Sequence, residues 1–303
     1  MSVVAMARAK VNLALEIVGR RPDGYHDLIT VLQAIGLEDR LTFRPRAEGI
    51  SLTVTGPWSA GVPVGEGNLV RRAAELLRRE SGCGGGAEIV LEKRIPAGAG
   101  LGGGSSDAAA ALICLAHLWG VEASPDRLAA LGARLGADVP FFVGGHGTCL
   151  ARGRGDVLEP LPELGDVWLA VAFPGLPQDT ARAYAHYDLQ PPGPPTPAAP
   201  VVEAIKASDR QALCSAIGNA LRPAVVSLRP DIEAVLKLLR DSGALAAELT
   251  GSGSAVFAVS PDQAGAVRLR GRLERAGLAA WAVPAMARTI SWGQEREVYE
   301  DGT

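Results

Sequence analysis

A glycine-rich run between a predicted strand and a predicted helix restricts the possible folds of this chain more than any other feature. Five of the seven residues from Gly98 to Gly104 are glycine. A strand-like stretch, 87–93, precedes the run, and an alanine-rich helical pattern, 107–119, follows it. Glycine allows a close approach of backbone to ligand, and the first N–H groups of a helix lack intrahelical partners and favour an anion. The sequence therefore predicts a phosphate-binding loop that ends in a helix N-terminus.

Two known nucleotide-binding motifs resemble this run, but neither fits. The first is excluded by the elements that follow the run, and the second by a missing lysine. Gly98-x-Gly100-x-x-Gly103 matches a dinucleotide fingerprint, but the segment 121–126 after the helix leads into another helix rather than a second parallel strand. Gly104 stands where the Walker A loop requires its lysine. A flexible surface turn is the remaining alternative, although such turns rarely run directly into an apolar helix. We expect the loop backbone to hold phosphate, with any cation supplied from elsewhere.

Length and composition place this loop in a globular protein of two domains. The 303 residues are 48% apolar and can bury a sizeable core. We expect neither a membrane span nor a signal peptide, because no apolar run is long enough and charged residues interrupt the N-terminal stretch. A net charge of −3 without basic blocks argues against nucleic acid and membranes as partners. Four scattered cysteines favour a reducing cytoplasm over a disulfide framework or a zinc site.

Periodicity predicts an α+β chain. In the first half it predicts strands at 3–18, 25–35, 39–45 and 50–55, and further helices at 69–79 and 125–135. In the second half it predicts strands at 168–173, 246–249, 255–259 and 278–283, and helices at 180–186, 201–207, 209–217, 230–242 and 261–276. We expect a mixed β/α nucleotide-binding domain over 1–155, with its phosphate loop at 96–106. A ferredoxin-like antiparallel α/β domain is expected over 156–303, with a disordered tail after about 290.

A phosphate loop without its own lysine needs charged or anion-binding groups from elsewhere in the chain, and three other sites could supply them. Lys10 lies in a strand of apolar and small residues, so it either faces solvent or points into a cleft. Asp138 lies close to two phenylalanines, where an unpaired carboxylate is unfavourable, and its simpler role is that of a turn or helix cap. The Thr-Gly-Ser-Gly segment at 250–253 is either a second anion-binding nest or a tight hairpin.

Four separated segments together resemble the GHMP kinase superfamily, which includes galactokinase, homoserine kinase and mevalonate kinase. They are 9–13 with 21–26, 93–110, 135–142 and 250–253. The glycine-rich segment is common to the superfamily. Ala-Lys-Val-Asn-Leu followed by Pro-Asp-Gly-Tyr-His, and the later Asp-Val-Pro-Phe-Phe, are more specific to the branch that acts on a cytidine-diphosphate-linked methylerythritol. The resemblance covers nearly the whole chain and implies a two-domain GHMP kinase fold.

The resemblance implies a role for each matching position. Lys10 and Asp138 match a catalytic pair in which the aspartate accepts the proton of the substrate hydroxyl and the lysine orients it. Positions that hold adenine and ribose match Asn68, Leu69 and Lys93. The phosphates of ATP would be wrapped by Pro96, Ala97, Gly98, Ala99, Gly100, Leu101, Gly102, Gly103, Gly104, Ser105 and Ser106. Contacts with the substrate are implied for Asn12, Tyr25, His26, Tyr184, Thr250 and Gly251, with the two tyrosines and the histidine around the cytosine.

ATP and Mg²⁺ are the implied cofactors, and Ser105 or Ser106 could contact the metal directly or through water. The scattered histidines argue against a metal site made by the chain alone. Two alternatives remain, a kinase of the same superfamily that acts on homoserine or mevalonate, and an inactive nucleotide-binding regulator. Tyr25 and His26 argue against the first, and the presence of both Lys10 and Asp138 argues against the second. The sequence is compatible with a monomer or a homodimer.

Overall fold

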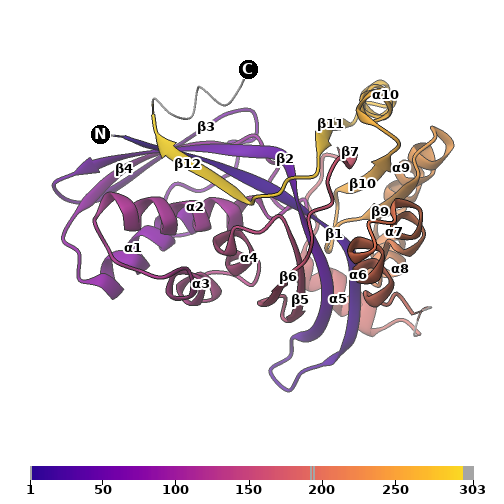
Figure 1. Cartoon of the computed structure of the whole chain (residues 1–303), viewed down its shortest axis with the longest axis horizontal. Coiled ribbons are helices and arrows are strands. Elements are labelled where there is room, and N and C mark those ends of the chain that lie inside the picture. The colour runs from indigo at the N-terminus through magenta and orange to yellow at the C-terminus, as the bar shows by residue number, and fades with distance from the viewer. Residues whose placement is uncertain (1, 192, 194, 296–303) are drawn as a thin grey trace.

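The chain folds around two β-sheets that lie side by side, each with helices packed against it (Figure 1). This computed structural model describes residues 2–191, 193 and 195–295. Within those residues the first sheet has eight strands, with the path β12-β1-β2-β4-β3 and with β5, β6 and β8 paired beside it. The second sheet has four strands in the order β11-β7-β10-β9. The predicted α+β class is confirmed.

Two long strands form the centre of the first sheet. β1 spans Val3–Arg20 and β2 spans His26–Arg46, and they pair antiparallel along their whole length. The sequence predicted two separate strands over β2. A register shift opposite Arg8 and Ala9 instead accommodates Gly36 and Leu37 as a bulge, so the strand continues. The β1–β2 hairpin projects beyond the rest of the first sheet (Figure 1) and ends at the turn before His26.

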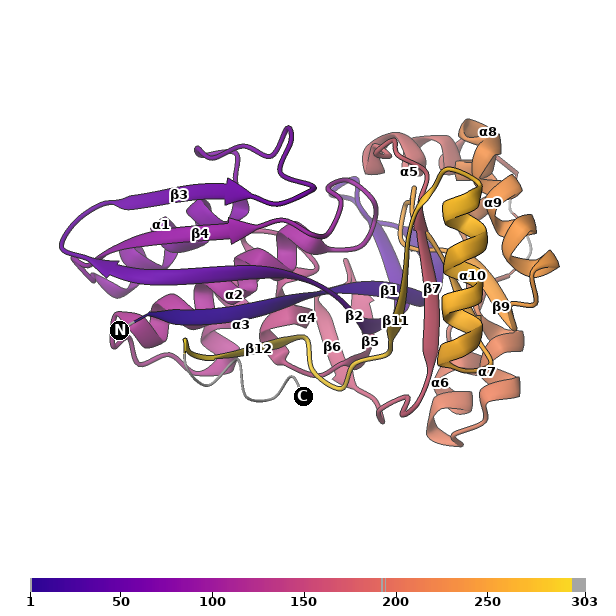
Figure 2. The same cartoon turned by 90° about the horizontal axis from the view of Figure 1, so that it is seen from above.

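Four helices lie on one face of the first sheet, as seen in both views (Figure 2). They are α1 Leu69–Ser81, α2 Gly103–Leu118, α3 Pro125–Ala133 and α4 Val139–Gly144. The remaining long elements of this half are β3 Ile50–Thr55, β4 Gly86–Glu92, β5 Thr148–Gly153 and β6 Val157–Pro160. The residues 108–111 of α2 are fully buried alanines, which lets the helix pack closely against the sheet. This helix begins four residues earlier than predicted, inside the glycine run.

The second sheet is antiparallel throughout and confirms the predicted ferredoxin-like half. Its strands are β7 Trp168–Phe173, β9 Ala246–Leu249, β10 Val256–Ser260 and β11 Ala279–Pro284. The helices of this half are α5 Thr180–Asp188, α6 Ala199–Lys206, α7 Arg210–Ala216, α8 Arg222–Leu228, α9 Pro230–Asp241 and α10 Gln263–Arg275. The sequence did not predict α4, α8, β5, β6, β8 or β12. In the described part of the chain, no helix is both long and apolar enough to cross a membrane.

Two short strands from the second half of the chain join the first sheet. β8, Gly218–Asn219, pairs parallel with β1 at Ala14 and Leu15. β12, Ile290–Gln294, pairs antiparallel with the beginning of β1, so the predicted disorder after about 290 is wrong for these residues. Ile290 is buried, and the ring of Trp292 lies 4.9 Å from that of His117, which explains the order. The rest of the predicted tail, 296–303, lies outside the described residues, and the domain boundary stays a prediction.

Candidate active site

The glycine-rich run forms a loop that can be approached from outside. Gly98, Gly100 and Gly102 have φ angles of 68°, 80° and 72°, which side-chain-bearing residues rarely adopt. Gly102 is the N-cap of α2 and has no side chain to cap the helix, so the first N–H groups are left for another partner. The side chains of Ala99 and Leu101 belong to the core. Those two residues can therefore meet a ligand only through their backbone.

A second glycine loop, residues 250–254, packs directly against the first. A Cβ atom added to Gly100 would lie 2.5 Å from the carbonyl oxygen of Thr250. The amide of Ala255 donates a hydrogen bond to the carbonyl of Ala99 at 2.9 Å. Only glycine at position 100 permits this approach, because both the contact and its φ exclude a side chain. The two glycine segments are therefore in direct backbone contact and present one continuous surface.

Lys10 extends from β1 into the space between the two loops. Its Nζ donates to Oδ1 of Asn12 at 2.8 Å and lies 3.6 Å from Oδ2 of Asp138. A Cβ atom on Gly102 would lie 3.0 Å from the Cγ of the lysine, and one on Gly251 would lie 3.5 Å from Nζ. Lys10 is 4% exposed, and a buried ammonium requires such partners. Of the two orientations that the sequence allowed, the structure has the inward one.

Asn12 and Thr250 fix the direction of this lysine. The hydroxyl of Thr250 accepts a hydrogen bond from the backbone N–H of Asn12 at 3.1 Å. The same hydroxyl donates to the side-chain Oδ1 of Asn12 at 3.2 Å. Nδ2 of Asn12 donates to the hydroxyl of Thr30 at 2.9 Å. Both side chains are buried and engaged with the protein itself. In the structure Asn12 and Thr250 thus support Lys10, while their predicted contacts with the substrate stay predictions.

Asp138 lies immediately before α4, and its side chain is partly exposed. Its side chain is 34% exposed, whereas that of Lys10 is 5% exposed. Although Asp138 occupies the N-cap position of α4, its carboxylate makes no capping hydrogen bond. The simpler role that the sequence allowed, a helix cap, is thus not the one that its side chain adopts. An accessible carboxylate beside a buried ammonium is suited to accept a proton from a bound hydroxyl.

An aromatic cluster surrounds His26 where the β1–β2 hairpin meets α5. The His26 ring is stacked on Tyr184, with centroids 4.9 Å apart, and meets the edge of Tyr187 at 6.2 Å. Nε2 of His26 donates to Oδ1 of Asp188 at 2.8 Å, which leaves Nδ1 without that proton in the neutral ring. Tyr184, Tyr187 and Asp188 have helical i, i+3, i+4 spacing. That spacing was the available signal for Tyr187 and Asp188, which the sequence analysis missed.

Tyr184 links this cluster to the catalytic candidates. Burial raises the pKa of Tyr184 well above its ordinary value, and the negative charge of Asp138 adds to the effect. Tyr25 differs from Tyr184, because it is 60% exposed and the guanidinium of Arg154 lies 5.7 Å from its ring centroid. The predicted cytosine-contacting residues are therefore brought together in part: His26 and Tyr184 are stacked, while Tyr25 lies at the outer edge.

Two of the residues predicted to contact adenine and ribose use their side chains within the protein. The side chain of Asn68 caps α1, with Oδ1 accepting from the amide of Val70 at 2.8 Å and Nδ2 donating to the carbonyl of Pro63 at 2.7 Å. Lys93 is 3% exposed, and its ammonium is turned inward. Leu69 remains compatible with the prediction, since a Cβ on Gly104 would lie 3.6 Å from it. Any nucleotide contact by Asn68 or Lys93 would have to use backbone atoms.

Lys93 is held between two buried carboxylates. Its Nζ donates to Oδ2 of Asp107, in the first turns of α2, at 2.8 Å and also to Oδ2 of Asp39. Oδ1 of Asp39 accepts from the amides of Arg94 and Ile95 at 2.5 and 2.8 Å. These contacts fasten the end of β4 and the beginning of α2 on either side of the loop. We refer to Asp39, Lys93 and Asp107 as the buried triad.

The two serines of the loop differ in access. Ser105 is half-buried, whereas Ser106 is fully buried and its Oγ has no hydrogen-bond partner among the described residues. Ser105 therefore carries the more accessible hydroxyl, and the contact of either serine with nucleotide or metal stays a prediction. The described residues contain no group of three or more histidine, cysteine or acidic side chains that could hold a metal ion. A cation at this loop would thus depend on phosphate oxygens for most of its ligands.

Comparison with known proteins agrees with the two-part architecture. Residues 68–146 match the family model described as GHMP kinases N terminal domain, and residues 201–279 match GHMP kinases C terminal. The chain is 46% identical over 279 residues to the 4-diphosphocytidyl-2-C-methyl-D-erythritol kinase of Pelotomaculum thermopropionicum, covering 91% of this chain and 95% of that protein. A crystal structure of 4-(cytidine 5'-diphospho)-2C-methyl-D-erythritol kinase is 38% identical, with a TM-score of 0.80 over 93% of this chain and 100% of the other. Homoserine kinase from Cytophaga hutchinsonii, at 19% identity and a TM-score of 0.76 over 96% and 97%, shares the fold.

Proposed function

The chain belongs to the GHMP kinases, in the family of 4-diphosphocytidyl-2-C-methyl-D-erythritol kinases, and we propose that it phosphorylates the 2-hydroxyl of that compound with ATP. The observation that carries the proposal is the pair of Lys10 and Asp138, 3.6 Å apart, between the two glycine loops. The pair places a base and a positive charge beside a loop suited to phosphate. The aromatic cluster around His26 lies near the same carboxylate and provides the second half of the substrate site.

Asp138 acts as the general base in this proposal. An alcohol is a poor nucleophile until its proton has an acceptor, and a positioned carboxylate contributes roughly 10²–10⁴-fold. The exposed fraction of Asp138 allows a substrate hydroxyl to reach it, while Lys10 behind it can orient the carboxylate. Lys10 also lies beside Gly102 and can stabilise the negative charge that develops on the transferred group. Asn12 and Thr250 hold the ammonium in place for both tasks.

The phosphates of ATP are assigned to the glycine loop and the N-terminus of α2. Glycines of positive φ keep the loop surface free of side chains, and the helix N-terminus supplies N–H donors and a favourable dipole. These features fit a triphosphate. Mg²⁺ bound with ATP would neutralise phosphate charge, with the Ser105 hydroxyl as the available side-chain ligand of the loop. Leu69 and the backbone near Asn68 and Lys93 are left for the adenine and ribose.

The cytidine end of the substrate is assigned to the aromatic cluster. A flat pyrimidine can stack on the rings of His26, Tyr184 and Tyr25. Asp188 holds the proton on Nε2 of His26 and so leaves Nδ1 as an acceptor, which suits the amino group of cytosine. Gly251 borders the cleft near Lys10 and leaves room for the methylerythritol part. This division explains how one cleft could bind two nucleotides without confusing their bases.

The test is release of ADP by the purified protein with Mg²⁺-ATP and each of three acceptors. We expect turnover with 4-diphosphocytidyl-2-C-methyl-D-erythritol and none above background with mevalonate or homoserine. Phosphorylation should be checked by ³¹P NMR of the product, because ATP hydrolysis alone also releases ADP. Turnover with mevalonate or homoserine instead would retain the phosphate loop and the catalytic pair but overturn the assignments around His26. Binding of ATP without turnover of any acceptor would favour the inactive regulator.

A further inference from the structure

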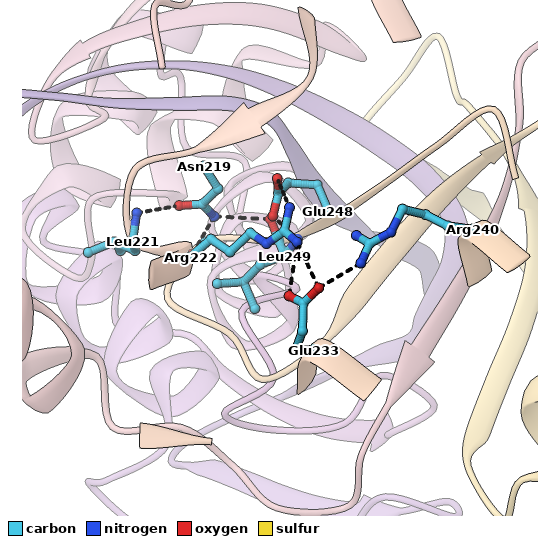
Figure 3. A network of polar contacts seen from close by, with 8 residues as sticks. Asn219, Leu221, Arg222, Glu233, Arg240, Glu248 and Leu249 are labelled. Atoms are coloured by element: carbon cyan, nitrogen blue, oxygen red, sulfur yellow. Dashed lines mark hydrogen bonds and ion pairs between the residues drawn. The ribbon is translucent and has the colours of Figure 1, made fainter. Parts of the chain in front are cut away.

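Asn219 connects the short strand β8 to the second glycine loop, and all of its side-chain hydrogen-bonding groups are engaged (Figure 3). Its Nδ2 donates to the carbonyl oxygens of Leu249 at 3.0 Å and Gly251 at 2.8 Å. Its Oδ1 accepts from the amide of Leu221 at 2.9 Å. Asn219 is 2% exposed, so its carboxamide bonds to these protein groups rather than to bulk solvent. The carboxamide therefore fixes the local backbone on both sides of residue 250.

The two carbonyls that Asn219 holds belong to the immediate neighbours of Thr250. Thr250 in turn binds Asn12 through its hydroxyl, and Asn12 accepts from the ammonium of Lys10. Lys10 lies beside Asp138. A continuous series of hydrogen bonds thus leads from Asn219 to the catalytic pair, although Asn219 touches neither Lys10 nor Asp138 in the contacts described.

β8 anchors Asn219 to the same strand that carries the lysine. Gly218 and Asn219 pair with Ala14 and Leu15 of β1, and the amide of Ala220 donates to the carbonyl of Leu15 at 2.8 Å. β1 also carries Lys10 and Asn12. Asn219 therefore connects the second glycine loop to β1. The position of this loop and the position of Lys10 are both set by the same strand.

We propose that Asn219 is a positioning residue for phosphoryl transfer, acting through Thr250 and Asn12 on Lys10. The inference rests on the proposed function, since the reaction is what the positioning serves. Loss of the two Nδ2 donors would leave two buried carbonyls without partners and free the loop to shift. Small displacements of catalytic groups reduce turnover strongly. ATP binding depends mainly on the first loop and should change far less.

The test compares Asn219→Ala and Asn219→Asp with the wild type. The aspartate variant keeps the shape and an acceptor for Leu221 but lacks both donors. We expect kcat to fall about 10- to 100-fold in both variants, while KM for ATP changes less than about threefold. Glu233→Gln is the matched control. Figure 3 shows that Glu233 pairs directly with Arg222 and Arg240. It reaches Leu249 only through Arg222 and Glu248, whereas Asn219 binds the Leu249 carbonyl directly. This control should retain the kcat of the wild type.

Amide hydrogen exchange of the protein alone provides a readout that does not need the substrate. The amide of Thr250 donates to the carbonyl of Ala255 at 3.1 Å, and that of Gly253 to the carbonyl of Thr250 at 3.0 Å. Both amides should exchange at least tenfold faster in Asn219→Ala and remain unchanged in Glu233→Gln. Unchanged exchange in the loop, or an unchanged kcat per folded molecule, would overturn the inference. If the wild type did not phosphorylate the cytidine substrate, the proposed function would be at fault, and the exchange rates would still decide the role of Asn219.

Discussion

Replacing Asp107 with asparagine should change how the stability of this protein depends on pH. The buried triad contains two carboxylates and only one ammonium. Asp39 also accepts from two backbone amides, whereas Oδ1 of Asp107 has no hydrogen-bond partner among the described residues. Burial raises the pKa of Asp107 to about 8, with Lys93 opposing this rise and the Asp39 carboxylate adding to it. Asp107 is therefore the member of the triad that holds a proton at neutral pH.

The size of the effect follows from the difference in the pKa of Asp107 between the folded protein and the unfolded chain. In the unfolded chain Asp107 releases its proton near pH 4, while in the folded protein it keeps the proton until about pH 8. Between these values the folded state binds more protons, so stability falls as pH rises, by about 1.4 kcal/mol per pH unit. From about pH 5 to about pH 7 the wild type should lose about 2 to 3 kcal/mol that Asp107→Asn does not lose. The pKa of Lys93 is raised by Asp107 and Asp39 despite its burial, so this lysine stays protonated throughout the window and contributes no slope.

Urea unfolding at several pH values between about 5 and 7 measures the difference directly. Intrinsic tryptophan fluorescence is a suitable probe, because one of the five tryptophans, Trp119, ends α2 and donates its indole N–H to the carbonyl of Gly86. Asp126→Asn, which removes an exposed aspartate from the first turn of α3, controls for a general change in charge. Equal pH dependence of Asp107→Asn and the wild type would refute the reasoning, since it would mean that Asp107 is ionised in the folded protein.

Three further predictions concern the cleft. Asp138→Asn should lower kcat about 10²- to 10⁴-fold with little change in ATP affinity, and near-normal turnover would exclude Asp138 as the base. Tyr25→Ala should raise KM for the cytidine substrate about tenfold without changing the melting temperature, because this ring is 60% exposed; an unchanged KM would remove Tyr25 from the site. Gly100→Ala should destabilise the protein by about 2 kcal/mol or more, because its Cβ would lie 2.5 Å from the carbonyl of Thr250 at a φ of +80°. Gly104→Ala makes an ordinary 3.6 Å contact and should melt near the wild type; similar melting of the two variants would show that the loops do not depend on this contact.

Local signals in the sequence were sufficient for the conformation of the glycine-rich loop and for the beginnings of two helices. Glycines at alternate positions, followed by an alanine-rich helix, carry their conformational meaning within a few residues. Asn68 and Ser124 stand directly before the predicted helices 69–79 and 125–135, and each caps its helix by accepting from an amide two or three residues away. The nucleotide contact expected of Asn68 stays a prediction, since its side chain is already bonded to Val70 and Pro63.

Contacts between distant parts of the chain could not be predicted in the same way. Asp39 and Lys93 are 54 positions apart, and His26 and Asp188 are 162 positions apart. Neither aspartate has a neighbour in sequence that indicates its partner. The tie from Asn219 to the second loop depends on β8, a strand of two residues that is too short to produce a periodic pattern. The sequence thus indicated Lys10 and Asp138 as the proposed catalytic pair, while the residues that hold this pair in place became evident only from the fold.

A comparison of the two buried lysines beside the loop supports Lys10, rather than Lys93, as the positive charge that the proposed reaction requires near the glycine run. Both are close to the beginning of α2: the Cγ of Lys10 would lie 3.0 Å from a Cβ on Gly102, and Nζ of Lys93 would lie 3.2 Å from one on Gly103. Lys93 faces two carboxylates, so the triad has no net positive charge in either protonation state of Asp107. Lys10 faces the neutral amide of Asn12 and a single carboxylate that is partly exposed to water. Once Asp138 takes up the substrate proton, its negative charge is cancelled and the Lys10 ammonium is left uncompensated at the moment when charge develops on the transferred phosphoryl group.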